Sequence, residues 1–519
     1  MLKLRNYLQD RWIEGEGVQT TLIDPATERE MATASAAGLD LGAALRHARE
    51  VGGPALRAMT FAERGALLMA MSRAIHAERE ALIDMAMQNG GNTRGDAKFD
   101  LDGGTGTIAA YAKIGESLGD TRHWLDGDAE TVMGGGSRML GRHVRVPRRG
   151  VAIHINAYNF PAWGMLEKIA CSFLAGMPVV TKPSSDTALV AHRIVEILVD
   201  SGVLPDGALG LVCGSAGDLL DHVGFQDVIA FTGSAKTGRI ISSHPRVLET
   251  GARVNIEADS LNAAVLGPDV EVDSETFDLF MRDLVKEMTQ KAGQKCTATR
   301  RVLATKERIG DVKARLAEEL PGIAIGVPGE DRVRMGPVSG PRALADLKEK
   351  LAALREVGEI VYGDPDAVEV LGRDGAKGAF VSPLVLEVAD ARQAAPVHAV
   401  ECFGPVTTLM PYDGTPEDAA AIVALGEGSL VTSFYSDDRD FSARFIEEVA
   451  PYQGRLLWGS QRVAGTAPFP GMVLPGFIHG GPGRAGGGEE LGGMRGLELY
   501  TQRVAVEGFG PLLDRFFGA

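Results

Sequence analysis

One cysteine in a small, polar segment is the first candidate for chemistry in this sequence. Cys296 lies in KAGQKCTATRR (residues 291–301), where Lys291 and Lys295 add positive charge and Gly293 allows a tight backbone. A thiol becomes a nucleophile when a helix terminus, a cation or a neighbouring base favours its ionised form. Taken alone, this segment is compatible with five roles for Cys296: a metal ligand, half of a disulfide, a redox sensor, an inert surface residue or a catalytic nucleophile.

The other cysteines give weaker signals. Cys171 (KIACSFLAG) and Cys213 (LGLVCG) lie in apolar runs and are predicted to be small core residues, whereas Cys402 stays open. The sequence has no CxxC pair and no zinc-finger spacing with histidine, so we expect no metal site and no disulfide framework.

Polar groups also follow several apolar runs. Asn159 in NAYNFPAW is either a turn former or an oxyanion donor. Glu257 in NIEADS ends an apolar run, so it is either paired with a cation or a general base with a raised pKa. FTGSAKTG has Gly233 and Gly238 around Ser234, and its free backbone amides at a helix start suit a phosphate, although it is not the G-x-G-x-x-G motif.

The elements that must position these groups alternate between strand and helix from residue 150 to 260. Strands are predicted at VAIHIN (151–156), PVVTK (178–182), LGLVC, DVIAFTG and RVNIEA, and helices at PAWGMLEKIACSFLAG, 187–202 and from about 235. This alternation predicts a parallel sheet covered on both faces, with ligands beyond the carboxyl ends of its strands.

A second α/β alternation follows residue 260, and Cys296 lies at its start. It includes a helix near 275–291, the strand 300–305, a helix at 307–319, and the later strands GSLVTSFYS and GRLLWGSQ. Near the N-terminus, Thr60 and Glu63 form a capping-box pattern, which predicts one long amphipathic helix that stops at Gly90–Gly91.

Two segments fall outside these alternations. ETVMGGGSRMLGRHVRVPRRG (130–150) has alternating runs around Gly134–Gly136, and we expect a hairpin that protrudes from the first domain. Exposed edges of this kind are usually paired, so an oligomer is plausible. The glycine-rich HGGPGRAGGGEELGG (479–493) is predicted to be a loop.

Composition limits the possible partners. The 519 residues are 45% hydrophobic, which predicts two or three domains. The net charge of −16 argues against nucleic acid as a partner. Because no apolar stretch approaches the roughly 18 residues of a membrane helix, and the first residues are too charged for a secretory leader, we expect a soluble, cytoplasmic protein with no membrane partner.

The order of these motifs resembles the aldehyde dehydrogenase superfamily. The motifs are N-x-x-N-F-P, T-K-P-S, F-T-G-S-x-x-x-G, a strand-end Glu, G-Q-x-C and E-x-F-G-P, and the resemblance runs from about residue 20 to 507. It implies an α/β fold of two Rossmann-type parallel-sheet domains with a protruding β-hairpin that mediates oligomerisation. The implied parts are a cofactor-binding domain at 1–127 and 148–260, a catalytic domain at 261–478, and an oligomerisation element at 128–147 and 495–519.

The resemblance also implies roles for single residues. Cys296 matches the catalytic thiol, Asn159 with the Cys296 backbone N–H matches the oxyanion hole, and Glu257 matches the base that activates water. Lys168 matches a lysine proposed in proton relay, although it could instead be a solvated or snorkelling lysine. Glu490 resembles a second glutamate that passes protons to solvent, with Glu489 or Glu498 as alternatives.

The implied cofactor is a nicotinamide dinucleotide. Lys182 matches a lysine that contacts the adenosine ribose, Ser234 lies near the pyrophosphate, and Glu401 and Phe403 match the residues that hold the nicotinamide ribose and ring. The remaining implied cofactor-binding residues are Ile155, Asn156, Ser184, Ser185, Gly214, Phe231, Thr232, Gly233 and Gly238.

Two departures from the family pattern matter. The chain has EADSLN where many members have E-L-G-G, so the motion of Glu257 is in question. Ser185 replaces a glutamate that many NAD-preferring members use to bind the adenosine ribose, and removing that charge favours NADP over NAD.

The implied reaction oxidises an aldehyde to a carboxylic acid through a thiohemiacetal and a thioester on the cysteine. Within the superfamily the sequence is most similar to the branch that degrades phenylacetate and benzoate aerobically. This implies a CoA-linked substrate such as 3,4-dehydroadipyl-CoA semialdehyde, and a homodimer. Five arginines either help at the substrate entrance or form a solvated or intersubunit hairpin face: Arg138, Arg142, Arg145, Arg148 and Arg149.

Three rival functions stay in view. A CoA-acylating dehydrogenase releases its thioester to CoA, and members of that kind typically lack the base that Glu257 matches. A nucleotide-binding protein with a dead site would not need Cys296, Asn159 and Glu257 together. A thiol hydrolase needs a histidine beside the thiol, and no histidine lies in a motif that would pair with Cys296.

Overall fold

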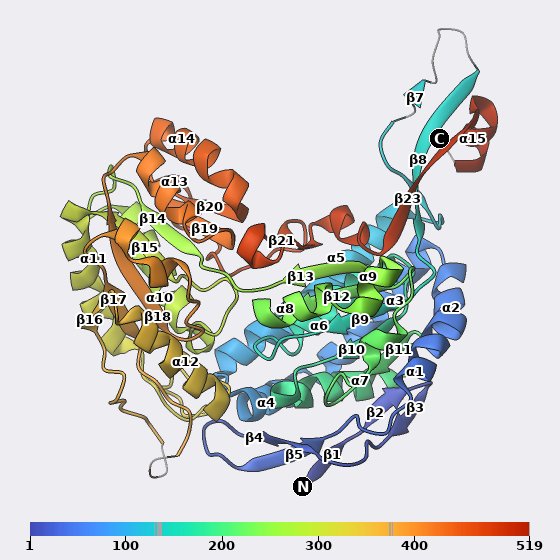
Figure 1. The fold of residues 1–519 in the computed structure, drawn as a ribbon, viewed down its shortest axis with the longest axis horizontal. Coiled ribbons are helices and arrows are strands. Elements are labelled where there is room, and N and C mark those ends of the chain that lie inside the picture. Colours follow the sequence, from blue (N-terminus) through green and yellow to red (C-terminus); the bar gives the residue numbers. More distant parts are fainter. Residues whose placement is uncertain (129, 132–137, 373–374, 376, 518–519) are drawn as a thin grey trace.

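The protein is described by a computed structural model that covers residues 1–128, 130–131, 138–372, 375 and 377–517. Figure 1 shows two α/β bodies side by side and a narrow element that projects from one of them. Each body is built on a mainly parallel seven-stranded sheet. The predicted α/β fold class is confirmed.

The first sheet carries the strands predicted between residues 150 and 260. Its order is β13 (Arg253–Glu257), β12 (Val228–Thr232), β9 (Ala152–Ile155), β10 (Val179–Lys182), β11 (Leu209–Leu211), β2 (Asn6–Leu8) and β3 (Arg11–Ile13). The first five strands are parallel, and β2 and β3 extend the sheet in antiparallel fashion.

Alternate residues of this sheet enter different cores. Ala152 and Val179 pack into one apolar cluster with the helices α3 to α7, whereas Ile153 and Val180 pack into another with α1 and residues of α8 and α9. Both faces are therefore covered, as expected of a parallel sheet. The helices of this half are α1 (Leu41–His47), α2 (Gly53–Ala58), α3 (Phe61–Ala77), α4 (Arg79–Gly90), α5 (Arg94–Leu118), α6 (Trp163–Leu174), α7 (Ala188–Asp200), α8 (Ala235–Ser242) and α9 (Pro245–Thr250).

The predicted long helix after Thr60 is two helices. The capping box is present, since Thr60 Oγ1 accepts from the Glu63 amide and Glu63 Oε2 accepts from the Thr60 amide at 2.7 Å. The prediction of one uninterrupted helix is wrong because Glu78 leaves helical geometry (φ −101°, ψ 18°). Both α3 and α4 pack on α5 and on α7.

Five residues separate the last strand of the first sheet, β13, from the first strand of the second sheet, β14. Its order is β16 (Glu359–Tyr362), β17 (Leu384–Glu387), β18 (Val406–Tyr412), β15 (Arg301–Thr305), β14 (Ala263–Leu266), β19 (Ser429–Tyr435) and β20 (Gln453–Gly459). All neighbours are parallel except β16 and β17. The covering helices are α10 (Glu275–Thr289), α11 (Lys306–Glu319), α12 (Pro341–Leu354), α13 (Pro416–Ala424) and α14 (Arg439–Val449).

A third, antiparallel sheet forms the projecting element at the upper right of Figure 1. Its central strand β8 (Met139–Pro147) pairs with β6 (Trp124–Leu125) and β7 (Glu130–Thr131) on one edge and with β23 (Thr501–Phe509) on the other. Helix α15 (Gly510–Phe517) follows β23. The pairing of β7 with β8 agrees with the predicted hairpin, whose turn at Gly134–Gly136 lies outside the described residues.

The hairpin arginines bind within the chain. Arg145 forms ion pairs with Asp126 and Glu498, and Arg142 pairs with Asp514. Arg148 donates to backbone carbonyls, including that of Phe225 at 2.7 Å. Arg145 and Arg148 are buried, so for these three arginines the contacts support a structural role rather than one at the substrate entrance.

Two smaller sheets complete the fold. One has the order β1 (Leu2–Leu4), β5 (Glu30–Ala34) and β4 (Thr20–Ile23), and the other pairs β21 (Ile478–Gly480) with β22 (Glu489–Leu491). The predicted loop at 479–493 thus contains a short hairpin. Within the part of the chain that the structure describes, no helix has both the length and the apolar character to cross a membrane.

Candidate active site

The carboxyl ends of neighbouring strands in the first sheet meet at one edge. Ile155 ends β9 and is paired with Lys182 at the end of β10, and Thr232 ends β12 beside Glu257 at the end of β13. The strand register alone therefore gathers residues that are far apart in sequence. Parallel sheets bind ligands at this edge.

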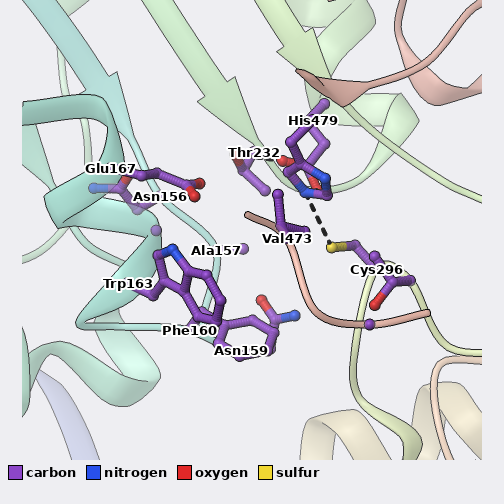
Figure 2. Close-up of a pocket in the computed structure, with 14 residues that line it drawn as sticks. Asn156, Ala157, Asn159, Phe160, Trp163, Glu167, Thr232, Cys296, Val473 and His479 are labelled. Carbon is purple, nitrogen blue, oxygen red and sulfur yellow. Dashed lines mark hydrogen bonds and ion pairs between the residues drawn. The ribbon is translucent and has the colours of Figure 1, made fainter. Parts of the chain in front are cut away.

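Cys296 faces this edge from the second half of the chain. A pocket there is lined by Cys296, Asn159, Glu257 and the apolar side chains of Phe160, Trp163 and Val473. Figure 2 shows Cys296 and His479 on one side of this pocket, with Trp163 and Phe160 across from them. The nucleophile candidate, the amide and the carboxylate that the sequence singled out thus share one pocket.

A strained turn delivers Cys296 to the pocket. Lys291, Ala292 and Gly293 all have positive φ values, of 54°, 52° and 67°. A Cβ on Gly293 would lie 2.2 Å from the carbonyl oxygen of Gly404, so this position requires glycine both for its conformation and for its space. Asn262 Nδ2 donates to the Cys296 carbonyl at 2.7 Å and holds the turn from the other side.

The lysines that flank Cys296 in sequence have partners elsewhere. Lys291 Nζ donates to Asn92 Oδ1 at 2.8 Å, and Lys295 Nζ forms a buried ion pair with Glu287 at 2.9 Å. Both side chains hold the turn in place. The expectation that their charge surrounds the thiol is not supported by these contacts.

The neighbour of Cys296 is a histidine that the sequence analysis missed. His479 on β21 places Nε2 3.6 Å from Cys296 Sγ and 3.1 Å from Glu257 Oε1. No histidine lies in a motif that would pair with Cys296, as expected, but the argument against a histidine beside the thiol that was drawn from this fails. The two residues are 183 positions apart, and only the β21–β22 hairpin brings the ring into the pocket, so no local motif could have revealed the contact.

The electrostatics of the three groups are coupled. Burial raises the pKa of Cys296 well above its usual value, and the charge of Glu257 raises it further. Burial would also raise the pKa of Glu257, but the charge and hydrogen bond of His479, aided by Lys168, lower it to about 2. The prediction of a raised pKa for Glu257 is wrong, and the alternative of a carboxylate paired with a cation holds.

Asn159 lies in the loop between β9 and α6 rather than at the strand end. Its Nδ2 donates to the Gln294 carbonyl at 3.1 Å, and Gln294 Nε2 donates to the Tyr158 hydroxyl at 2.9 Å. These bonds tie the amide to the turn that carries Cys296. An amide nitrogen has two hydrogens, so the second remains available to a ligand.

Lys168 occupies a buried cluster behind the pocket. Its Nζ lies 2.8 Å from Thr232 Oγ1, 3.0 Å from Glu490 Oε2 and 3.6 Å from Glu167 Oε1. The alternative of a solvated lysine is wrong, since the side chain is 1% exposed. Burial, and to a lesser extent the charge of Glu490, raise the pKa of Glu167 to about 8 despite the nearby lysine.

Of the three glutamates named for proton transfer, the structure brings only Glu490 to this cluster. Glu490 lies on β22 opposite His479 on β21. Glu489 is exposed, and Glu498 pairs with Arg145 in the projecting element. Glu167 and His479 were missed by sequence reasoning, and the position of Glu167 beside Lys168 on one helix was the only available hint.

A second cleft adjoins the pocket and shares Asn156, Asn159, Thr232, Glu257 and Cys296 with it. Ten of the thirteen predicted cofactor residues line this cleft, and its lining does not include the other three, Ser185, Gly214 and Gly238. The ten are Ile155, Asn156, Lys182, Ser184, Phe231, Thr232, Gly233, Ser234, Glu401 and Phe403.

The cleft fits a ribose and a ring. Glu401 Oε1 is buried there, and among the described residues it has no hydrogen-bond partner. Burial raises the pKa of Glu401 to about 7 although Arg300 lies near. Its ion pair with Arg300 is long, at 4.0 Å. A buried oxygen without a hydrogen bond is costly, and the hydroxyls of a ribose are suitable donors. Phe403, in contact with Tyr158, offers an apolar surface beside it.

The start of α8 is less open than expected. The Ala235 amide donates to Asp259 Oδ1 at 2.9 Å, and the Thr237 amide donates to Ser234 Oγ. The prediction of free amides at this helix start is wrong for these two groups. Asp259 of EADSLN, at a position where many family members have glycine, supplies the carboxylate that binds the Ala235 amide, and Ser234 binds the Thr237 amide. A bound pyrophosphate would have to compete with this carboxylate.

Comparison with known proteins agrees with this geometry. The aldehyde dehydrogenase family model matches residues 12–506. The chain is 43% identical to 3,4-dehydroadipyl-CoA semialdehyde dehydrogenase from Aromatoleum evansii over 482 residues, which are 93% of each chain.

Solved structures share the fold. A point mutant of betaine aldehyde dehydrogenase from Staphylococcus aureus, in complex with NAD+, has a TM-score of 0.83 at 22% identity, over 98% of this chain and 96% of that one. Lactaldehyde dehydrogenase from Escherichia coli has a TM-score of 0.83 at 21% identity, over 98% and 99%.

Proposed function

The chain belongs to the aldehyde dehydrogenase family, and from this we propose that it oxidises a CoA-linked semialdehyde to the carboxylic acid with NADP. The observation that carries the proposal is the pocket in which Cys296, Asn159 and Glu257 meet, open to the cleft lined by Glu401 and Phe403. The relative from Aromatoleum evansii supports the substrate class by its name.

In this proposal Cys296 is the nucleophile. Its sulfur adds to the aldehyde carbon, and the oxyanion receives hydrogen bonds from Asn159 Nδ2 and from the Cys296 amide. A bound nicotinamide supplies the hydride acceptor, and Glu401 and Phe403 hold it in the cleft. The acyl group then remains on Cys296 as a thioester.

Glu257 is proposed to receive the proton of the water that hydrolyses the thioester. Its Oε2 lies 3.5 Å from Thr232 Oγ1, which in turn accepts from Lys168 Nζ at 2.8 Å. Lys168 also contacts Glu490 and Glu167. This chain of contacts leads from the pocket into the buried cluster, and we propose that it carries the proton away.

The NADP preference is supported at Ser185 and Lys182. Lys182 Nζ donates to the Pro183 carbonyl at 3.1 Å, and it forms no ion pair among the described residues. A lysine in the cleft without a carboxylate partner suits a 2′-phosphate, and Ser185 adds no negative charge near it in sequence. We expect tighter binding of NADP+ than of NAD+ by calorimetry, and Ser185→Glu should reverse the order. Tighter binding of NAD+ by the unmodified protein would contradict the preference.

The substrate is tested with a panel of aldehydes that includes CoA-linked semialdehydes. The apolar wall of Phe160, Trp163 and Val473 suits an aliphatic chain. Mass spectrometry of the product should show a free carboxylate where the aldehyde was. A new acyl-CoA thioester at that carbon would favour the alternative of a CoA-acylating enzyme. The observation that favours this alternative is the ion pair of Glu257 with His479, because a paired carboxylate is a weaker base for water.

The proposed biological setting is the aerobic breakdown of aromatic acids such as benzoate, in the cytoplasm. We also propose the domain division of 1–127 with 148–260, 261–478, and 128–147 with 495–519. It is supported by β13, which ends the first sheet at Glu257, and by β14, which starts the second at Ala263. A homodimer through the projecting element is supported by exposed apolar side chains on β23 and α15, namely Val504, Phe509, Leu512 and Phe516.

A further inference from the structure

The contact between His479 and Cys296 has no role in the reaction described so far. We propose that His479 is a further catalytic residue, which takes the proton of the Cys296 thiol and so forms the attacking thiolate. This inference rests on the proposed role of Cys296 as the nucleophile. The observation that supports the inference is that one ring nitrogen of His479, Nε2, contacts both Cys296 Sγ at 3.6 Å and Glu257 Oε1 at 3.1 Å.

The ring is held where a proton acceptor is needed. His479 is 6% exposed and lies on β21, opposite Glu490 of β22. A Cβ on Gly480, the next residue, would lie 2.0 Å from the Gly488 carbonyl oxygen, so the two strands are in close backbone contact. This packing fixes the position of the ring in the pocket, where Figure 2 shows it directed at the sulfur.

The thiol needs such an acceptor because its surroundings oppose ionisation. Cys296 lies in a largely apolar pocket, and the titratable side chain in contact with it besides His479 is the carboxylate of Glu257. The charges of Glu167 and Glu401, further away, also raise the pKa of the thiol. Lys291 and Lys295 have other partners. A second negative charge beside Glu257 is unfavourable unless a positive charge forms between them.

The proposed transfer provides that positive charge. The S–H bond breaks and its electron pair stays on sulfur, while an N–H bond forms at Nε2. The total charge of Cys296, His479 and ionised Glu257 remains one negative. Before the transfer the ring is neutral with its proton on Nδ1, so Nε2 can accept the thiol proton. The ion pair with Glu257 belongs to the state after the transfer, when the new N–H on Nε2 lies between the thiolate and Glu257 Oε1 and the carboxylate stabilises the imidazolium.

Other charges near the ring come from several elements. Glu167 on α6 favours the charged ring and Arg455 on β20 disfavours it. Lys168 and Glu490 lie one shell further out, joined to each other at 3.0 Å. Replacing the ring by phenylalanine keeps its bulk and leaves these groups in place.

The test measures the thiolate directly, without aldehyde or cofactor. Cys296 of the full chain is alkylated with iodoacetamide from acid to alkaline pH, and the modified peptide is quantified by mass spectrometry. Cys171, Cys213 and Cys402 are buried and serve as unreactive references. In His479→Phe we expect the neutral-pH rate at Cys296 to fall about tenfold or more, and the profile to move to higher pH.

A matched control and a rescue complete the experiment. His222→Phe changes a histidine that pairs with Asp218 outside the pocket and should leave the alkylation profile unchanged. In His479→Ala, added imidazole should accelerate the alkylation of Cys296 and not that of the wild type. Because the rescue compares one variant with itself, it remains decisive if His479→Phe folds poorly.

Two results would overturn the inference. One is a wild-type alkylation profile in His479→Phe, and the other is no effect of imidazole on His479→Ala. Either would leave the proposed function intact. That function fails on a separate result, namely aldehyde oxidation that survives in Cys296→Ala.

Discussion

Glu257 pairs with His479 in the pocket, and this pair determines which proton transfers its neighbours can take part in. Its carboxylate accepts from His479 at 3.1 Å and lies 3.5 Å from the Thr232 hydroxyl. A carboxylate with a pKa near 2 is a weak base for water. Efficient proton abstraction therefore requires the carboxylate to leave His479 or to pass the proton on through Thr232 and Lys168.

A substitution of Glu257 tests its proposed role after hydride transfer. Glu257→Gln keeps the size of the side chain and removes the base, so the thioester should form and then accumulate. We expect a burst of reduced cofactor of about one equivalent per site followed by a steady rate lower by about 100-fold or more. Rapid-mixing absorbance measures both phases, and a steady state equal to that of the wild type would exclude the role.

A buried histidine far from the pocket should make stability depend on pH. Burial lowers the pKa of His398 from 6.5 to about 4, with Arg301 adding to the effect. Arg301 Nη1 donates to His398 Nδ1 at 3.1 Å, and His398 Nε2 donates to the Ala391 carbonyl at 2.7 Å, which suits the neutral ring.

The unfolded chain therefore binds one more proton than the native protein between about pH 4 and 6.5. The contribution of His398 is fully present above pH 6.5 and is lost as the pH falls towards 4, by at most about 1.4 kcal/mol per pH unit. Urea unfolding across this range should show a shallower pH slope in His398→Asn than in the wild type. Equal slopes would mean that His398 is protonated in the native state.

Local patterns predicted individual groups well where the strand register determines their position. Glu257 follows directly from the carboxyl end of a predicted strand, whereas Lys182 and Thr232 were named by the family resemblance and lie at strand ends as well. His479 and Asp259 did not follow, because their contacts depend on the close approach of segments with irregular backbone, and no periodic pattern reports such an approach.

At the scale of elements, the turn before Cys296 is locked to the loop that carries Glu401. Gly293→Ala would place a methyl group 2.2 Å from the Gly404 carbonyl oxygen. We expect a loss of about 1 to 3 kcal/mol of unfolding free energy and a marked loss of activity.

The matched control is Gly251→Ala, which has a similar φ of 61° and no atom within 4 Å of the new methyl group. It should show only the cost of the left-handed backbone, about 1 kcal/mol. Equal losses in the two variants, measured by thermal and urea unfolding, would show that contact with Gly404 is unimportant.

The start of α8 should bind cofactor more tightly once Asp259 is removed. Asp259→Gly frees the Ala235 amide and removes a negative charge beside the site proposed for the pyrophosphate. Calorimetry should show NADP+ affinity higher by about three- to tenfold. Asp438→Gly removes a similar cap from α14, outside the cleft, and should leave the affinity unchanged. Weaker binding in Asp259→Gly would show that Asp259 supports the site.

Most elements were predictable because their periodicity reports burial directly. The parallel strands and the helices α6, α7, α10 and α11 lie close to their expected ranges. The break at Glu78 was not predictable from the same signal. Both α3 and α4 bury part of their surface, and both pack against α7, which is more than a hundred residues away.

At the scale of the whole molecule, α15 exposes Leu512 and Phe516 by 62% and 75%. Apolar side chains so exposed on a projecting element suit contact with a second copy. Leu512→Glu with Phe516→Glu should shift the mass measured by light scattering from dimer to monomer. Leu248→Glu, on the exposed surface of α9, should leave the mass unchanged. A wild-type protein that is already monomeric would contradict the homodimer.

The long-range pairing in this fold also sets an order in time. Strand β8 can pair with β23, over nine residue pairs, only after residues 501–509 have been synthesised. His479 likewise follows Cys296 by 183 residues. On the ribosome the N-terminal half can fold first, but the base proposed for the thiol emerges near the end of translation. The nascent chain therefore carries the sulfur without its proposed base from the synthesis of residue 296 until residue 479 has been added.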